Sequence, residues 1–191
     1  MAERSVQSAT LRRVARDAAD YPSLLRLRLG ENAPLELTML GDPSLLRVRR
    51  TALFCSARTP GDAILRTHDA ARRMRDEGVT VISGFHSSIE KECLHILLRG
   101  KQPAIICAAR AIEAMRIPKE CRVAFDAGRV LLLSPFTGQP KRITKESALR
   151  RNEVVAALAD DVYIAHVSPG GGTARIEHML ERWSVPRADG T

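Results

Sequence analysis

The stretch VTVISGFHSSIEKECLHILLRGKQPAIIC, residues 79–107, contains a full strand–helix–strand unit. Val79–Ile82 and Ala104–Cys107 are short, densely apolar runs without alternation, which is typical of strands covered on both faces. Between them, Ser88–Leu98 carries apolar residues at helical spacing. Two neighbouring parallel strands need such a crossover helix between them, so the stretch predicts a parallel sheet.

The same alternation continues on both sides of this stretch. Further strands are expected at Ala52–Cys55, Val130–Leu133 and Val162–Val167. Further helices are expected at Asp62–Glu77, with Asp62 as N-cap, and at Lys145–Ala159 and Gly172–Trp183. Strands and helices that alternate in this way predict an α/β fold, a Rossmann-like, doubly wound and mostly parallel sheet.

The first fifty residues have a different pattern. Leu11–Ala19 has helical spacing, Ser23–Leu29 can form a second short helix, and apolar residues alternate with polar ones from Leu35 to Met39 before a Gly-Asp-Pro turn. We therefore expect residues 1–50 to form a short N-terminal arm with helices and one strand. Residues 51–191 are expected to form the Rossmann-like domain.

Composition narrows the class of protein. The chain has 191 residues, of which 45% are hydrophobic, and no apolar run reaches the roughly 18 residues of a membrane span. Its N-terminus lacks a secretory signal pattern, so we expect a soluble, cytoplasmic protein with no membrane partner. The four cysteines form no C-x-x-C pair, which indicates reduced, buried thiols.

Charge indicates an anionic partner. The chain carries 30 Lys and Arg against 22 Asp and Glu, for a net charge of +8, and 25 of its cations are Arg. The planar guanidinium fork of Arg suits phosphate and stacks on bases, which favours nucleic acid or a nucleotide. A modest positive charge can also serve solubility alone.

Three loops are expected to carry the binding chemistry. Ligands of open parallel sheets bind beyond the carboxyl ends of the strands, where small residues let backbone N–H groups approach a phosphate. The candidate residues in these loops are Ser56, Arg58, Ser83, Gly84, Phe85, Gly170, Gly171, Gly172 and Thr173. Each loop alone could be an ordinary turn, but three at one edge favour phosphate binding.

A basic segment adds to this edge. Lys141 and Arg142 begin a run of five cations with one carboxylate, and such a run can equally be a solvated helix face. Arg151 and Asn152 stand one helix before the last strand and can turn toward the loops. We include all four residues in the predicted phosphate or nucleic-acid site.

The sequence offers little support for cofactor-dependent, metal-dependent or nucleophilic catalysis. The sequence has no G-x-G-x-x-G after the first strand of the domain and no P-loop, which argues against a dehydrogenase or a P-loop NTPase. His and Cys residues lack metal-ligand spacing, and G-x-S-x-G is absent. We expect no metal ion and no cofactor. Glu153 and Glu177 could serve in acid–base chemistry or pair with nearby arginines.

Seven segments, in chain order, resemble motifs of one family: Tyr21–Leu25, Leu35–Leu46, Cys55–Arg58, Ser83–Glu90, Gly128–Pro135, Arg151–Asn152 and Ser168–Ala174. This family is the DNA-processing protein A family, DprA, also called Smf. The resemblance implies a Rossmann-like core that binds single-stranded DNA, and a role with a recombinase in DNA recombination or uptake. A homodimer is also compatible with it.

The last third of the chain also resembles the LOG-type phosphoribohydrolases, formerly described as lysine-decarboxylase-like. The likeness lies in Pro169–Thr173 with Glu177 nearby and Arg150 or Arg151 on the preceding helix. It implies an alternative function, cleavage of the N-glycosidic bond of a nucleoside monophosphate, with Arg151 and Glu177 as catalytic residues. A further alternative is a domain that senses a nucleotide without turnover.

Overall fold

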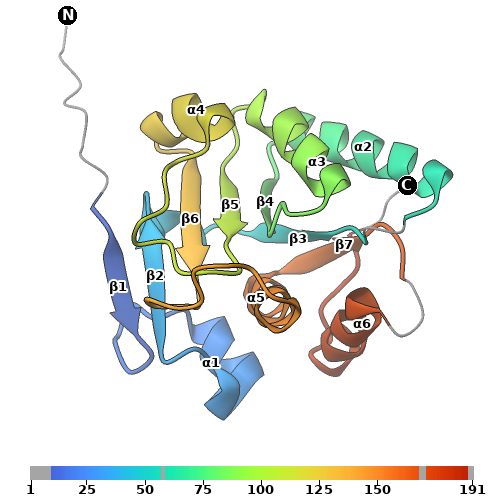
Figure 1. Cartoon of the computed structure of the whole chain (residues 1–191). Helices are drawn as coiled ribbons and strands as arrows, with labels where there is room; N and C mark the ends of the chain where they lie inside the picture. Colours follow the sequence, from blue (N-terminus) through green and yellow to red (C-terminus); the bar gives the residue numbers. More distant parts are fainter. Residues whose placement is uncertain (1–9, 57–58, 168–170, 189–191) are drawn as a thin grey trace, which may run out of the picture.

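The structure is a computed structural model that describes residues 10–56, 59–167 and 171–188 (Figure 1). Its strands are β1 (Arg12–Ala15), β2 (Glu36–Leu40), β3 (Arg50–Phe54), β4 (Thr80–Ser83), β5 (Ala104–Cys107), β6 (Val130–Ser134) and β7 (Asp161–Ile164). Its helices are α1 (Ser23–Leu29), α2 (Gly61–Asp76), α3 (Ser88–Leu98), α4 (Arg122–Asp126), α5 (Lys145–Leu158) and α6 (Gly172–Arg182). The predicted α/β class is confirmed.

The seven strands of the described residues form one mixed, mostly parallel sheet in the order β1-β2-β6-β5-β4-β3-β7. The five strands from β6 to β7 in this order are parallel, whereas β2 is antiparallel to both β6 and β1. From β3 the chain adds strands in one direction as far as β6, and then returns to the other side of β3 with β7. This reversal is a topological switch point, beside which such sheets bind ligands.

Helices cover both faces of the sheet. Figure 1 shows α2, α3 and α4 on one face, and α1, α5 and α6 on the other. Successive residues of β3 point to opposite layers: Leu53 packs in the cluster with α2 and α3, and Phe54 in the cluster with α5. Because both faces are covered, the parallel strands are mostly apolar, with polar residues such as Arg50, Ser83 and Asp161 at their ends, which explains the dense runs in the sequence.

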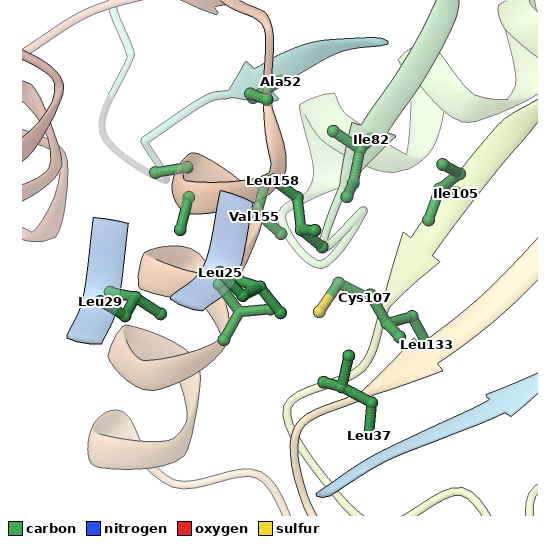
Figure 2. Packing of buried hydrophobic residues seen from close by; sticks show 14 of the residues in the cluster. Leu25, Leu29, Leu37, Ala52, Ile82, Ile105, Cys107, Leu133, Val155 and Leu158 are labelled. Atoms are coloured by element: carbon green, nitrogen blue, oxygen red, sulfur yellow. The ribbon is translucent and has the colours of Figure 1, made fainter. Parts of the chain in front are cut away.

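The residues before β3 belong to this sheet and its core. Leu25 of α1 and Leu37 of β2 are both fully buried in the cluster that contains Val155 and Leu158 of α5, as Figure 2 shows. The predicted helix at Ser23–Leu29 and the strand after Leu35 are confirmed. The predicted division of the chain into an arm of residues 1–50 and a domain of residues 51–191 stays a prediction. Strands β1 and β2, which precede residue 50, extend the sheet formed by the later strands.

The helix expected at Leu11–Ala19 is wrong. Residues Arg12–Ala15 form β1, which pairs with β2, and Val14 is buried between exposed neighbours. A four-residue strand with one buried side chain gives too short an alternation to be told from helical spacing.

The boundaries of other elements differ slightly from expectation. Helix α2 begins at Gly61 with Pro60 in the N-cap position, so Asp62 lies in the first turn, where it pairs with Arg66. Strand β7 ends at Ile164, three residues earlier than predicted. The sequence does not predict the five-residue helix α4, because so short an element has no periodic pattern.

Two expectations from composition can be compared with the structure. Among the described residues, no helix is both long and apolar enough to cross a membrane. All four cysteines are free and buried, as predicted. Burial raises the pKa of Cys93 and of Cys107 to about 12, so these thiols stay protonated.

Candidate functional site

The candidate site lies where β3, β4 and β5 end, at Phe54, Ser83 and Cys107. These parallel strands are neighbours in the sheet, so the loops that follow them meet at its carboxyl edge. Two predicted site residues, Arg58 and Gly170, lie outside the described residues. The structure describes the other predicted site residues.

Glu90 connects two of these loops. Its Oε1 accepts a hydrogen bond from the backbone N–H of Cys55 at 3.1 Å, and its Oε2 accepts from the N–H groups of His86 and Ser87 at 2.8 and 3.2 Å. Ser87 Oγ in turn accepts from the N–H of Glu90, which completes a capping box at the start of α3. One buried carboxylate therefore fixes the end of β3 relative to the loop after β4.

The guanidinium of Arg151 reaches the same edge from the other face of the sheet. Its Nη1 donates to the backbone oxygen of Cys107 at 3.3 Å, and its Nε donates to Oδ1 of Asn152 at 2.7 Å. A Cβ at Gly84 would lie 1.4 Å from Nη1, so the side chain fits only against glycine. The structure brings Gly84, Arg151 and Asn152 together, as the sequence suggested.

Ser83 and Phe85 together fix the conformation of the loop that follows β4. The Ser83 hydroxyl donates to the backbone oxygen of Leu53 at 2.7 Å and accepts from the N–H of Phe85 at 3.3 Å, so its proton is already engaged. Phe85 has a φ of 44° and a buried side chain that packs in the cluster with α2 and α3. Both residues hold the loop in place, and neither side chain is presented to solvent.

Ser56 directly follows Cys55, the residue whose backbone N–H donates to Glu90. It is half-buried, and its backbone oxygen accepts a hydrogen bond from Thr59 Oγ1 at 2.7 Å. Sequence reasoning missed Glu90 as the residue that organises this region. The Ser-x-x-Glu spacing of the capping box was the available signal, but it does not indicate the third bond, to Cys55.

The basic segment follows β6 at the same edge. Lys141, Arg142 and Lys145 are exposed, and none of them has an ion-pair partner within residues 10–56, 59–167 and 171–188. The segment is anchored at both ends, because Ala111 N–H donates to the Pro140 oxygen at 3.0 Å and Thr144 forms a capping box with Ser147. These cations are therefore available to an anion in solvent.

The glycine loop is described only at its end. Gly171 is the N-cap of α6, with no side-chain cap, and Gly172 and Thr173 form the start of the helix. A Cβ at Gly172 would lie 3.2 Å from Cδ2 of Leu149, so this glycine lets α6 approach α5 closely. Thr173 is half-buried.

The two carboxylates considered for acid–base chemistry both pair with arginines. Glu153 accepts from Arg150 at 3.0 Å and from Arg175 at 2.7 Å, and Glu177 pairs with Arg187. Within the described residues, no hydrogen bond or ion pair joins Glu177 to Arg151. The same part of the chain contains no group of three His, Cys, Asp or Glu side chains suited to a metal ion.

A cavity of about 870 Å³ lies at the opposite edge of the sheet, where β2 ends and β3 begins. Two of its cations pair with carboxylates, Arg12 with Asp20 and Arg49 with Asp161 at 3.0 Å, and the guanidinium of Arg50 donates to backbone oxygens. Size alone does not make it the better candidate, because its charges are largely balanced and it lies away from the carboxyl edge.

Comparisons with known proteins also relate the chain to proteins that process DNA. The sequence model of the family described as DNA recombination-mediator protein A matches residues 12–179. No curated protein matches the sequence. Among solved structures, DNA processing protein A from Helicobacter pylori, described for its unique single-stranded DNA binding mode, has a TM-score of 0.72 and 19% identity. That match covers 96% of this chain and 86% of the other.

DNA processing protein A from Streptococcus pneumoniae also has a TM-score of 0.72 at 19% identity. The match covers 93% of this chain but only 62% of the Streptococcus protein. At this identity the two structures show a shared fold. The match to the family model covers residues 12–179, which is most of the chain, and this match identifies the family to which the chain is related.

Proposed function

Because the chain belongs to the DNA recombination-mediator protein A family, we propose that it binds single-stranded DNA at the carboxyl edge of its sheet. The Helicobacter protein of the same fold is described as binding single-stranded DNA. The observation that carries the proposal for this chain is that Lys141, Arg142 and Lys145 are exposed in the segment between β6 and α5, the helix whose Arg151 reaches Gly84 at the carboxyl edge.

Phosphates account for most of the expected contacts. Backbone phosphates attract guanidinium and ammonium groups regardless of sequence, and each contact releases counterions. The basic segment supplies three such groups, and Arg58 is predicted to add another. Arg151 has a different role in the proposal: its fork holds the loop after β4 in the shape that admits a strand of DNA.

Base stacking is expected to be sparse. Aromatic residues make up 4% of the chain, and the side chain of Phe85 is buried. Phe136, two residues after the end of β6, is half-buried and is the better candidate for a stacking platform. Binding should therefore depend little on base sequence.

The direct test is titration of a fluorescent single-stranded oligonucleotide with the protein at several salt concentrations. We expect saturable binding that weakens steeply as salt increases. Absence of binding at low salt would remove the proposal. Thermal unfolding with a panel of mononucleotides provides a second arm, because a ligand of the native state alone raises the Tm. A shift with a mononucleotide and no oligonucleotide binding would favour the nucleotide-sensing alternative.

A recombinase partner and a homodimer are further parts of the proposal. The description of the family as a recombination mediator supports the first. Co-sedimentation with a recombinase on single-stranded DNA tests that partner, and light scattering of the eluted protein tests the dimer. A monomer with no effect on recombinase loading would limit the proposed function to DNA binding.

A further inference from the structure

A second basic surface lies between α1, α5 and α6. These three helices cover the same face of the sheet (Figure 1), and α5 contacts both of the others. Between them is a groove of about 450 Å³. We call it the arginine groove; it is lined by residues 27–30 and 32 of the α1 region, by Arg150 and Glu153 of α5, and by Arg175, Met179, Arg182 and Trp183.

The arginine groove has an excess of positive charge. Four guanidinium groups line it, from Arg28, Arg150, Arg175 and Arg182, against the single carboxylate of Glu153. Both oxygens of that carboxylate are taken, by Arg150 at 3.0 Å and by Arg175 at 2.7 Å. The carboxylate cannot neutralise four cations, so the groove attracts an anion.

Arg28 and Arg182 differ in whether their guanidinium groups are free to bind an anion. Arg28 donates to the backbone oxygens of Ala157 and Ala159 at the end of α5, at 3.1 and 2.5 Å, and is therefore held in place. Arg182 is exposed at the end of α6, and its guanidinium has no ion pair or hydrogen bond within the described residues. It is the cation that an incoming carboxylate can approach most readily.

The same groove has an apolar side. Leu27 is 79% exposed and lines the groove together with Met179 and Trp183, so the three side chains form an apolar patch beside the arginines. Trp183 and Met179 are partly buried beside it, and the Arg28 guanidinium lies 5.9 Å from the centre of the Trp183 ring. An occupant that covers Leu27 must carry an apolar group as well as negative charge.

We propose that the arginine groove binds an acidic peptide segment with an apolar anchor residue, supplied by a partner protein. Carboxylates meet Arg182 and its neighbours, and the anchor covers Leu27 beside Trp183. The backbone of a nucleic acid satisfies the charge but leaves Leu27 exposed. The volume suits a few side chains of an extended segment rather than a folded domain.

The sole tryptophan of the chain gives a local readout. The acetylated peptide Asp-Glu-Asp-Glu-Leu-Phe is titrated into the protein while Trp183 fluorescence is recorded. We expect a saturable change that the peptide Asp-Glu-Asp-Glu-Ser-Ser reproduces only weakly and Lys-Lys-Lys-Lys-Leu-Phe does not reproduce. Failure of the first peptide to bind, or equal binding of all three, overturns the proposal.

Two variants with matched controls locate the site. Arg182→Glu is expected to raise the Kd about tenfold, because an attraction becomes a repulsion, and Leu27→Ser about threefold. The controls Arg122→Glu and Val123→Ser change equally exposed residues of α4, on the opposite face, and should leave the Kd unchanged.

The same variants distinguish peptide binding in the arginine groove from DNA binding at the carboxyl edge. If a single-stranded oligonucleotide changes Trp183 fluorescence and Arg182→Glu weakens that change, the groove binds nucleic acid and the peptide proposal is wrong. If the oligonucleotide binds with no dependence on Arg182 while the peptide depends on it, the two sites are distinct and both proposals hold.

Discussion

The guanidinium of Arg151 occupies the space above Gly84 in which any other residue would place its Cβ, 1.4 Å from Nη1 and 2.0 Å from Cζ. The two residues come from different elements, Arg151 from α5 and Gly84 from the loop after β4. Arg151 also donates to the Cys107 oxygen, so the contact joins the ends of β4 and β5. The observed position of the Arg151 guanidinium is thus compatible only with glycine at residue 84, which is distant from Arg151 in sequence.

The Gly84→Ala change should displace Arg151 and break its bond to Cys107. We expect a loss of about 1–3 kcal/mol in the free energy of unfolding, which is typical of overpacking a tight contact. Urea denaturation followed by tryptophan fluorescence measures it. Gly61→Ala is the matched control, because a Cβ there meets no atom within 4 Å. Equal stability of the two variants would show that Arg151 yields without cost.

The carboxylate of Glu90 accepts three backbone N–H groups, and its amide analogue can accept with one oxygen only. Glu90→Gln should therefore lower the free energy of unfolding by about 1–3 kcal/mol, because buried donors are left without an acceptor. Oligonucleotide affinity should decrease as well, since the loops at the carboxyl edge are no longer connected.

Glu92→Gln on the same helix serves as the comparison. Its side chain is 57% exposed and contacts His68 alone among the described ion pairs. We expect its stability to differ from that of the wild type by less than about 0.5 kcal/mol. If both substitutions have the same small effect, Glu90 does not organise the edge.

Tyr21 provides a prediction on pH. Burial raises its pKa to about 12, against the lowering effect of Arg150, Arg16 and Arg26, and its hydroxyl donates to the Pro34 oxygen at 2.8 Å. The folded pKa lies above the unfolded value of 10.0, so the stability from this group is complete below pH 10 and is lost as the pH rises toward 12.

Ultraviolet absorbance of tyrosinate measures this shift. The chain has two tyrosines, so the Tyr163→Phe variant reports Tyr21 alone. We expect a midpoint near pH 12 in the folded protein and near pH 10 in urea, where the ring is no longer buried. A midpoint near pH 10 without urea would mean that the folded protein does not bury this ring.

The sequence allowed most of the sheet to be predicted, because strands covered on both faces are densely apolar, as Ala104–Cys107 is. It did not indicate β1, in which only Val14 is buried. Phe85 was expected to face a ligand, but its positive φ turns the side chain into the core. Such reversals depend on a backbone conformation that composition does not encode.

Contacts between distant segments were the hardest part of the site to anticipate. Arg151 could be expected at the edge from its place before the last strand, but its seat on Gly84 depends on the packing of α5 beneath β4 and β5. Glu90 reaches Cys55, 35 residues earlier, because α3 begins beside the end of β3. Spacing along the chain predicts neighbours within a helix or strand, and neither pair is of that kind.

The salt dependence of single-stranded DNA binding in a Lys141→Ala, Arg142→Ala double variant shows whether DNA binds at the carboxyl edge. Each phosphate that the variant no longer neutralises should reduce the slope of log K against log salt by about 0.7, and the affinity should decrease for every sequence. The control is Arg99→Ala, Lys101→Ala, which removes two exposed cations before β5, at the opposite edge of the sheet. We predict a reduced slope for the first pair and an unchanged slope for the second; equal slopes in both would contradict DNA binding at the carboxyl edge.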